Sequence, residues 1–375
     1  MRSRFASFVA AGLVTGGLLL ACGSRTGLFG ADPSLEISVD ASIDVSIDVV
    51  ACVPGEFTFE LALTQLMFVL DRSGSMAFTL DGRRLQPRSQ WRWTLLQNAL
   101  ERTITTFDDQ IAMGAKFYPQ ELNDGQGSSE EACAVAGGVD IPPAKGNAEA
   151  ILSVFDTTTP LGGTPTSEAI RIAAEALNAG RGVARAIVLA TDGAPNCNGD
   201  IPQATCTCTS AADQQSCNTA INGRFNCLDD TRTIRVIGEV NEQQRIPIYV
   251  IGIGSTERPD FLQVLDDMAV AGGRPRASTP RHYRVQSQDE MESALIGIRD
   301  EVGRCTYLTP SAPTNPDSIS VRVDGVTIPR DPTKTSGWDW INREYGALAF
   351  FGDACARAQG ASTPEAVAGT VRCDP

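Results

Sequence analysis

Long apolar runs alternate with helical patterns through the middle of the chain. Three runs have the continuity of strands buried on both faces, residues 66–70, 186–190 and 246–253, and a further strand is predicted at 111–118. Apolar residues at three- and four-residue spacing predict helices at 93–107, 148–155, 167–179, 229–244, 261–270 and 291–302. This alternation predicts an α/β fold over residues 52–305, with a doubly wound, mostly parallel sheet flanked by helices.

Residues 306–375 follow a different pattern, rich in Pro, Gly, Thr and Asp. Residues 318–323 alternate, residues 347–351 form another strand candidate, and Asp324-Gly325 is a hairpin signal. We expect a small β-rich C-terminal extension, stapled by a Cys355–Cys373 bridge. It should pack on the main domain, because about 70 residues hold little core of their own. Trp338 and Trp340 either anchor this extension or form an exposed binding patch.

The N-terminus is typical of an export signal. Arg2 and Arg4 precede a short apolar run that ends in Leu19-Leu20-Ala21-Cys22. This ending resembles the lipobox of bacterial lipoproteins, which implies a signal peptide over 1–21 and a lipid on Cys22. The alternative is an ordinary signal peptide with an incidental cysteine. Cys22→Ala is then expected to release a lipid-anchored chain from membranes.

Residues 22–51 are predicted to be an acidic tether, because a small-apolar-acidic unit repeats at 38–40, 42–44 and 46–48. The same alternation could also form a strand. The expected location is the bacterial cell envelope, with the lipid as the only membrane attachment. Gly23, where inner-membrane lipoproteins typically carry Asp, favours the outer membrane.

Cysteine usage supports export. With Cys22 assigned to the lipid, an even set remains of the 11 cysteines, and even sets in exported chains predict disulfides. The set is Cys52, Cys133, Cys197, Cys206, Cys208, Cys217, Cys227, Cys305, Cys355 and Cys373. A zinc site is the alternative, but only Cys206 and Cys208 are close together and the chain has a single histidine.

The sequence predicts only part of the disulfide pairing. Cys52 and Cys305 flank the α/β region, whose ends often lie close together, so a Cys52–Cys305 bridge is expected. Cys133 and the five cysteines of a predicted insertion at 196–228 would then pair among themselves, in an order that the sequence does not give.

Charge and composition narrow the range of functions. The 375-residue chain carries a net charge of −14, which argues against nucleic-acid binding because neutralising phosphates requires basic patches. The single histidine supports no Ser-His-Asp arrangement. The chain also lacks a phosphate-binding P-loop and a His-Glu-x-x-His metal motif. We therefore expect that it is not an enzyme.

Three short segments share an unusual density of oxygen-bearing side chains. Asp71-Arg72-Ser73-Gly74-Ser75 follows the first buried strand, Thr191-Asp192-Gly193 follows another, and Gly162-Gly163-Thr164-Pro165-Thr166 leads into a helix. Open α/β sheets bind ligands at the carboxyl ends of their strands. An all-oxygen set selects a hard cation such as Mg²⁺, with Mn²⁺ or Ca²⁺ as alternatives. Taken alone, the Gly-Gly-Thr-Pro segment could simply start a helix.

Together, the three segments resemble the metal-ion-dependent adhesion site of von Willebrand factor A domains, and the resemblance covers about 240 residues. It implies that Ser73, Ser75 and Thr164 contact the metal directly, and that Asp71 and Asp192 act partly through water. At least one position on the metal would remain for a partner's carboxylate.

The expected function is therefore that of a cell-envelope lipoprotein that binds a protein or matrix ligand through a divalent cation. The alternative is a non-catalytic accessory or structural envelope protein whose domain scaffolds a complex.

Overall fold

The computed structural model describes residues 50–121, 129–177, 184–209, 217, 223–254 and 259–373. Cys22, the expected signal peptide at 1–21 and nearly all of the expected tether at 22–51 lie outside these residues. Within the described part of the chain, no helix is long and apolar enough to cross a membrane.

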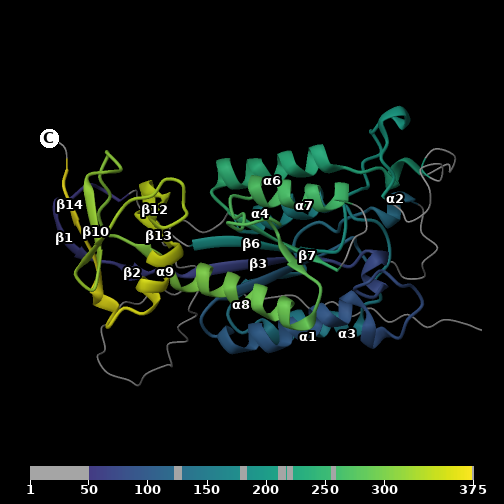
Figure 1. The fold of residues 1–375 in the computed structure, drawn as a ribbon, viewed down its shortest axis with the longest axis horizontal. Helices are drawn as coiled ribbons and strands as arrows, with labels where there is room; N and C mark the ends of the chain where they lie inside the picture. The colour runs from purple at the N-terminus through teal and green to yellow at the C-terminus, as the bar shows by residue number, and fades with distance from the viewer. Residues whose placement is uncertain are drawn as a thin grey trace, which may run out of the picture. The chain divides into compact units, whose positions relative to one another are not determined.

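A six-stranded sheet forms the centre of the α/β part (Figure 1). Its order is β5-β4-β3-β6-β7-β8, and every pairing is parallel except that of β5 with β4. The strands are β3 (Thr64–Asp71), β4 (Ala112–Tyr118), β5 (Ile141–Ala144), β6 (Ala184–Thr191), β7 (Ile248–Ile253) and β8 (Tyr283–Val285). The doubly wound, mostly parallel sheet predicted from the sequence is confirmed.

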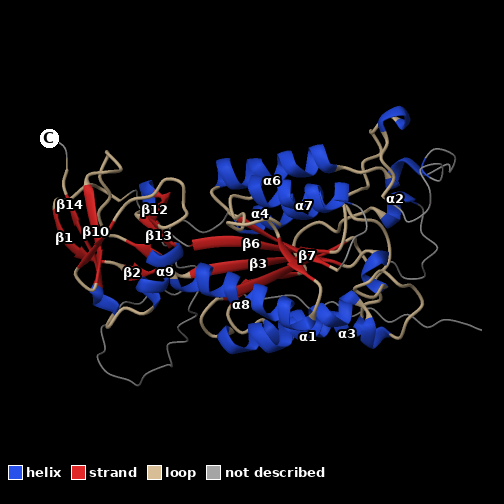
Figure 2. Cartoon of the chain, viewed as in Figure 1, coloured by secondary structure: helices blue, strands red, loops and turns tan. Residues whose placement is uncertain are grey.

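Helices cover both faces of this sheet (Figure 2). On one face lie α1 (Arg92–Ile104), α3 (Ala148–Thr157) and α8 (Gln288–Arg304), and on the other α4 (Thr166–Leu177), α6 (Asp230–Gln244) and α7 (Pro259–Ala271). Side chains alternate along a strand, so Phe68 of β3 packs with the first layer while Met67 and Val69 pack with the second. Burial on both faces explains why β3 reads as an unbroken apolar run.

Shorter elements occupy the connections. The region 119–146, expected to be loops and a hairpin, holds α2 (Ser129–Ala132) and the edge strand β5. The 3₁₀ helices are η1 (Gly74–Ala77), η2 (Arg88–Gln90), η3 (Thr105–Phe107), η4 (Gln203–Thr205), η5 (Gly223–Asn226), η6 (Arg343–Tyr345) and η7 (Pro364–Ala366).

Two further sheets of four strands build the extension. One has the order β1-β14-β10-β11 and the other β12-β13-β9-β2. Their strands are β1 (Gly55–Thr58), β2 (Glu60–Leu61), β9 (Thr306–Leu308), β10 (Ile319–Val323), β11 (Val326–Ile328), β12 (Gly337–Asn342), β13 (Ala347–Phe351) and β14 (Val367–Val371), with α9 (Gly352–Gln359) after β13.

The extension therefore begins before the α/β part as well as after it. β1 pairs with β14 and β2 pairs with β9, so residues 55–61 belong to the extension and not to the α/β domain expected to start at residue 52. Phe59 is buried in the core of the extension, which explains this pairing. The α/β part is inserted between the two pieces.

Two local expectations for the extension are confirmed. Asp324 and Gly325 connect β10 to β11 with positive φ angles of 48° and 74°, as a tight hairpin turn requires. Trp338 and Trp340 are 1% and 9% exposed and lie in the core of the extension. They anchor it and do not form an exposed patch.

All ten cysteines of the expected set form disulfides, but two expected pairs are wrong. The structure pairs Cys52 with Cys373 and Cys305 with Cys355. The first pair forms because Gly55 of β1 lies opposite Val371 of β14. The second forms because β9, which follows Cys305, pairs with β13, which runs directly into α9. The other bridges are Cys133–Cys197, Cys206–Cys227 and Cys208–Cys217, within the set expected to pair internally.

Candidate functional site

The two carboxylates of the predicted site lie at the same edge of the sheet. Asp71 is the last residue of β3, and Asp192 follows Thr191, the last residue of β6. β3 and β6 are parallel neighbours, with Leu70 opposite Ala190, so their carboxyl ends coincide. Asp71 is fully buried and Asp192 is 8% exposed, so both charges lie largely out of solvent.

Hydrogen bonds connect the carboxylates through the two serines. The Ser73 backbone N–H donates to Asp71 Oδ1 at 2.8 Å, and Ser75 Oγ donates to Asp192 Oδ1 at 2.8 Å. The hydroxyl oxygens of Ser73 and Ser75 are 3.1 Å apart. The structure thus brings Asp71, Ser73, Ser75 and Asp192 into one cluster of oxygens.

The Thr164 loop is held beside this cluster by its backbone. The Gly74 N–H donates to the Gly162 carbonyl at 3.1 Å. The Thr164 N–H donates to Asn196 Oδ1 at 2.7 Å, and the Asn196 N–H donates back to the Thr164 carbonyl at 2.9 Å. Asn196, which the sequence analysis missed, therefore joins the loop after β6 to the loop that carries Thr164.

The Cys133–Cys197 disulfide packs directly against the loop that carries Thr164. A β-carbon added at Gly163 would lie 2.5 Å from Cys197 Sγ, too close for any side chain. Gly162 has a φ of +98°, and a β-carbon there would lie 2.7 Å from the Ala132 carbonyl oxygen. Close packing thus requires glycine at both positions, and at Gly162 the positive φ favours glycine as well.

Arg92 is the main residue of the site that sequence reasoning missed. It is the first residue of α1, and its Nη1 lies 2.6 Å from Asp192 Oδ2. The Arg92 side chain is 8% exposed and the Asp192 side chain is fully buried. The Nε of Arg92 is buried without a hydrogen-bond partner among the described residues. The only sequence feature that could have drawn attention to Arg92 is its position between two tryptophans, Trp91 and Trp93.

Burial and charge strongly affect Asp71. Desolvation, followed by repulsion from Asp192, raises the pKa of Asp71 to about 7. The hydroxyl of Thr191, which donates to Asp71 Oδ2 at 2.6 Å, opposes this rise. A bound cation would stabilise the ionised form of both carboxylates.

The donor chemistry fits a hard divalent cation. The candidate ligands Asp71, Ser73, Ser75, Thr164 and Asp192 supply only oxygen, which suits Mg²⁺, Mn²⁺ or Ca²⁺. Nowhere in the described ranges do three His, Cys, Asp or Glu side chains gather as a metal-holding group. A metal at this site would therefore depend on the hydroxyl oxygens.

Comparison with known proteins finds likeness only among solved structures, since no protein-family model and no curated protein matches the chain. The PilB minor pilin from Streptococcus sanguinis is 17% identical with a TM-score of 0.44, over 65% of this chain and 62% of the pilin. The pilus adhesin SpaC from Lactobacillus rhamnosus GG is 12% identical with a TM-score of 0.44, over 85% of this chain and 40% of SpaC. The vWF domain of the type V pili tip protein Mfa5 from Porphyromonas gingivalis is 10% identical with a TM-score of 0.41, over 65% of this chain and 97% of that domain.

Proposed function

We propose that the chain is a non-catalytic binding protein of the bacterial cell envelope, built on a von Willebrand factor A-type domain. In this proposal it binds a protein or matrix ligand through a divalent cation at its metal-ion-dependent adhesion site. The observation that carries the proposal is the oxygen cluster of Asp71, Ser73, Ser75 and Asp192 at the carboxyl edge of the sheet. Export and lipid attachment at Cys22 remain predictions from the sequence.

In this proposal the hydroxyl residues and the carboxylate residues have different roles in holding the cation. The hydroxyls of Ser73, Ser75 and Thr164 would hold the cation without neutralising it, and Asp71 and Asp192 would supply the negative charge. A bound Mg²⁺ would provide the positive charge and the open coordination position that a partner's Asp or Glu carboxylate can occupy. The protein's part is to keep these oxygens in place through the backbone contacts of the three loops.

A second candidate is favoured by the Arg92–Asp192 ion pair. An internal guanidinium already neutralises Asp192 at 2.6 Å, so the site could hold its loops together without a metal. The chain would then act as a structural or accessory envelope protein, and its domain would scaffold a complex.

Titration calorimetry with Mg²⁺ and Mn²⁺ separates the two candidates. The unmodified chain should bind either ion saturably, and both Asp71→Ala and Asp192→Ala should abolish the heat of binding, because each removes one of the two charged ligands. Asp200→Ala is the matched control, since Asp200 is exposed in the same loop region. If the unmodified chain binds neither ion, the adhesion proposal fails and the structural candidate stands.

A further inference from the structure

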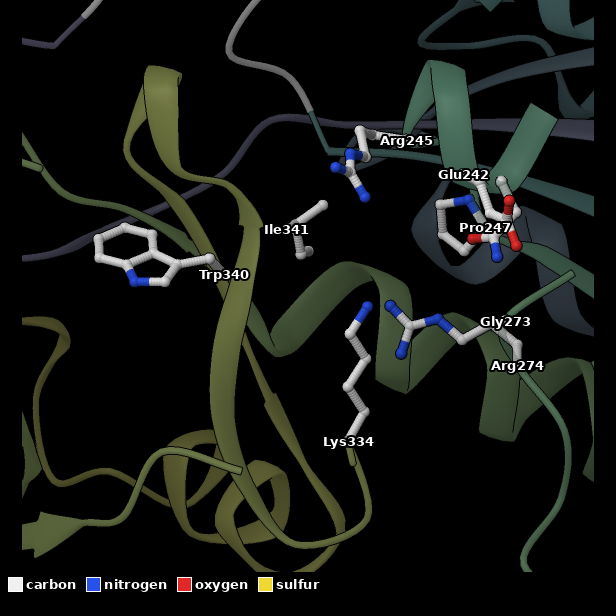
Figure 3. A pocket seen from close by; sticks show the side chains of 9 residues that line it. Glu242, Arg245, Pro247, Gly273, Arg274, Lys334, Trp340 and Ile341 are labelled. Atoms are coloured by element: carbon white, nitrogen blue, oxygen red, sulfur yellow. The ribbon is translucent and has the colours of Figure 1, made fainter. Parts of the chain in front are cut away.

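A basic cavity lies at the other end of the central sheet from the candidate metal site. It has a volume of about 240 Å³ and is lined by the C-terminal end of α6, by Pro247 just before β7, and by residues 273 and 274 after α7. Lys334, Trp340 and Ile341 of the extension close it (Figure 3). Pro247 marks the amino edge of the sheet, whereas Asp71 and Asp192 lie at the carboxyl edge.

The charge of this cavity is opposite to that of the chain. The net charge of the chain is −14, yet Arg245, Arg274 and Lys334 line the cavity against a single acidic lining residue, Glu242. Figure 3 shows the ends of Lys334 and Arg274 facing each other, with Arg245 above them and Glu242 beside Pro247. Burial, together with the charges of Arg274 and Arg245, lowers the pKa of the Lys334 amine, and the charge of Asp339 only partly opposes this. The cations therefore repel one another, and an anion between them would relieve that repulsion.

Arg274 forms the fixed inner wall of the cavity. Its Nη1 lies 2.8 Å from Glu301, and its guanidinium stacks 5.6 Å from the ring centre of Tyr249 and 5.0 Å from that of Phe351. Only 11% of the side chain is exposed. Its Nε is buried and has no hydrogen-bond partner among the described residues. Such an unpaired buried donor is costly, and the guanidinium end of the same side chain faces Lys334 across the cavity (Figure 3).

Arg245 and Lys334 are long basic side chains on strained backbone. Their φ angles are +56° and +58°, in the left-handed region where Gly or Asn is favoured. Arg245 ends α6 in this conformation. The structure shows no ion pair of either residue with the described part of the chain. Two basic side chains thus extend toward one cavity from backbone positions that disfavour them, which suggests a use for their charge.

The loop that carries Lys334 is pre-organised. The carboxylate of Asp331 accepts hydrogen bonds from the backbone N–H groups of Thr333, Thr335 and Ser336, each at 2.9 Å. The Lys334 N–H donates to the Asp331 carbonyl, also at 2.9 Å. The position of Lys334 is thus set by its own loop, without a ligand.

We propose that this cavity binds a phosphate group, either as the free anion or as the headgroup of a phospholipid. A multiply charged tetrahedral anion can accept from donors that converge from several sides, and guanidinium groups match phosphate oxygens well. The volume is below the roughly 300–1,000 Å³ of most small-molecule sites, so it suits a headgroup-sized anion.

Calorimetric titration of the full chain with inorganic phosphate, in the presence of EDTA, tests the site. Lys334→Asn and Arg245→Asn remove each charge but retain a residue suited to the left-handed backbone, so the fold should persist. Each should weaken phosphate binding at least about tenfold, because a charged hydrogen bond is lost. Arg235→Gln is the matched control, since Arg235 is an exposed residue of α6 that pairs with Glu239.

Vesicle flotation distinguishes the two sources of phosphate. Phosphatidylcholine vesicles that contain phosphatidic acid should carry a Cys22→Ala chain upward if the ligand is a lipid headgroup, and phosphatidylcholine alone should not. The Cys22→Ala substitution removes the predicted lipid, which would otherwise cause flotation by itself. Binding of inorganic phosphate without flotation assigns the site to the free anion. The proposal is overturned if neither probe binds, or if the two Asn variants bind as well as the unmodified chain.

Discussion

Asp192 has two different partners, one on each carboxylate oxygen. Ser75 donates to Oδ1 and Arg92 to Oδ2, and the Asp192 side chain is fully buried. A buried carboxylate without a counter-charge would be strongly destabilising. Arg92 is therefore the counter-charge that offsets the burial of this carboxylate when no metal is present.

Arg92→Met should lower the free energy of unfolding of the metal-free chain by about 3 kcal/mol, because it leaves Asp192 buried and unpaired. Urea unfolding in EDTA measures this loss of stability. Excess Mg²⁺ should make the loss smaller, because the bound ion supplies another positive charge beside Asp192. Arg83→Met is the control: Arg83 is 67% exposed and pairs with the exposed Asp81, so its loss should cost about 0–1 kcal/mol. Equal effects of the two substitutions would contradict this account.

For individual residues, the sequence predicted the site residues that belong to a recognisable motif. It missed the residues that reach the site only through the tertiary fold. The predicted group was Asp71, Ser73, Ser75, Thr164 and Asp192. Hydrogen bonds join all of these except Thr164 into one cluster, and the Thr164 loop is held beside it by its backbone. Arg92 is 100 positions from Asp192 and belongs to no repeating pattern. Its side chain reaches the site because α1 begins at the edge where β3 ends, and no local spacing reveals that contact.

Among the elements, the loop before α4 depends most on covalent support. Gly163 packs against Cys197 Sγ, and Asn196 beside it binds both backbone groups of Thr164. The Cys133–Cys197 bridge thus holds a loop that carries one expected metal ligand. Its role resembles that of the outer partners of metal ligands, which fix a ligand's orientation without touching the metal.

Replacing both Cys133 and Cys197 by Ser should weaken Mg²⁺ binding about tenfold or more, because the Thr164 loop loses its support. Calorimetric titration measures the change. The matched control replaces Cys305 and Cys355, whose bridge lies in the extension, and should leave Mg²⁺ affinity unaltered. A similar loss in both double variants would show that disulfides act on the site only through general stability.

The long buried strands could be predicted from the sequence, whereas the short strands that pair with distant segments could not. β3, β6 and β7 are fully or largely buried, so their composition alone marks them. β1 and β2 have four and two residues, and their partners are more than 200 positions away. Pairing with distant strands determines where β1 and β2 lie. The same long-range pairing explains why the disulfide partners predicted for Cys52 and Cys305 were wrong.

At the scale of the molecule, the extension is a single unit made from both ends of the described chain. β1 and β2 complete its two sheets, and the Cys52–Cys373 bridge links its first and last parts. Removing either piece alone leaves the other without its strand partners.

A chain restricted to 50–305 should therefore self-associate, because Phe57 and Phe59 lose their packing partners and Cys52 and Cys305 lose their disulfide partners in the extension. A chain restricted to 62–304 lacks these strands altogether and is the matched control, expected to remain monomeric. Light scattering after size-exclusion chromatography compares the two. A monomeric 50–305 chain would show that β1 and β2 need no partner strand.

The position of β3 also determines how the molecule would respond to mechanical load. β2 and β3 are separated only by residues 62 and 63, and β3 ends at Asp71. Tension between residue 50 and the carboxyl edge would therefore run along β3, which is hydrogen-bonded on one side to β4 and on the other to β6. Because the bonds of parallel strands are evenly spaced along their length, such a pull must shear both ladders together instead of opening them one bond at a time.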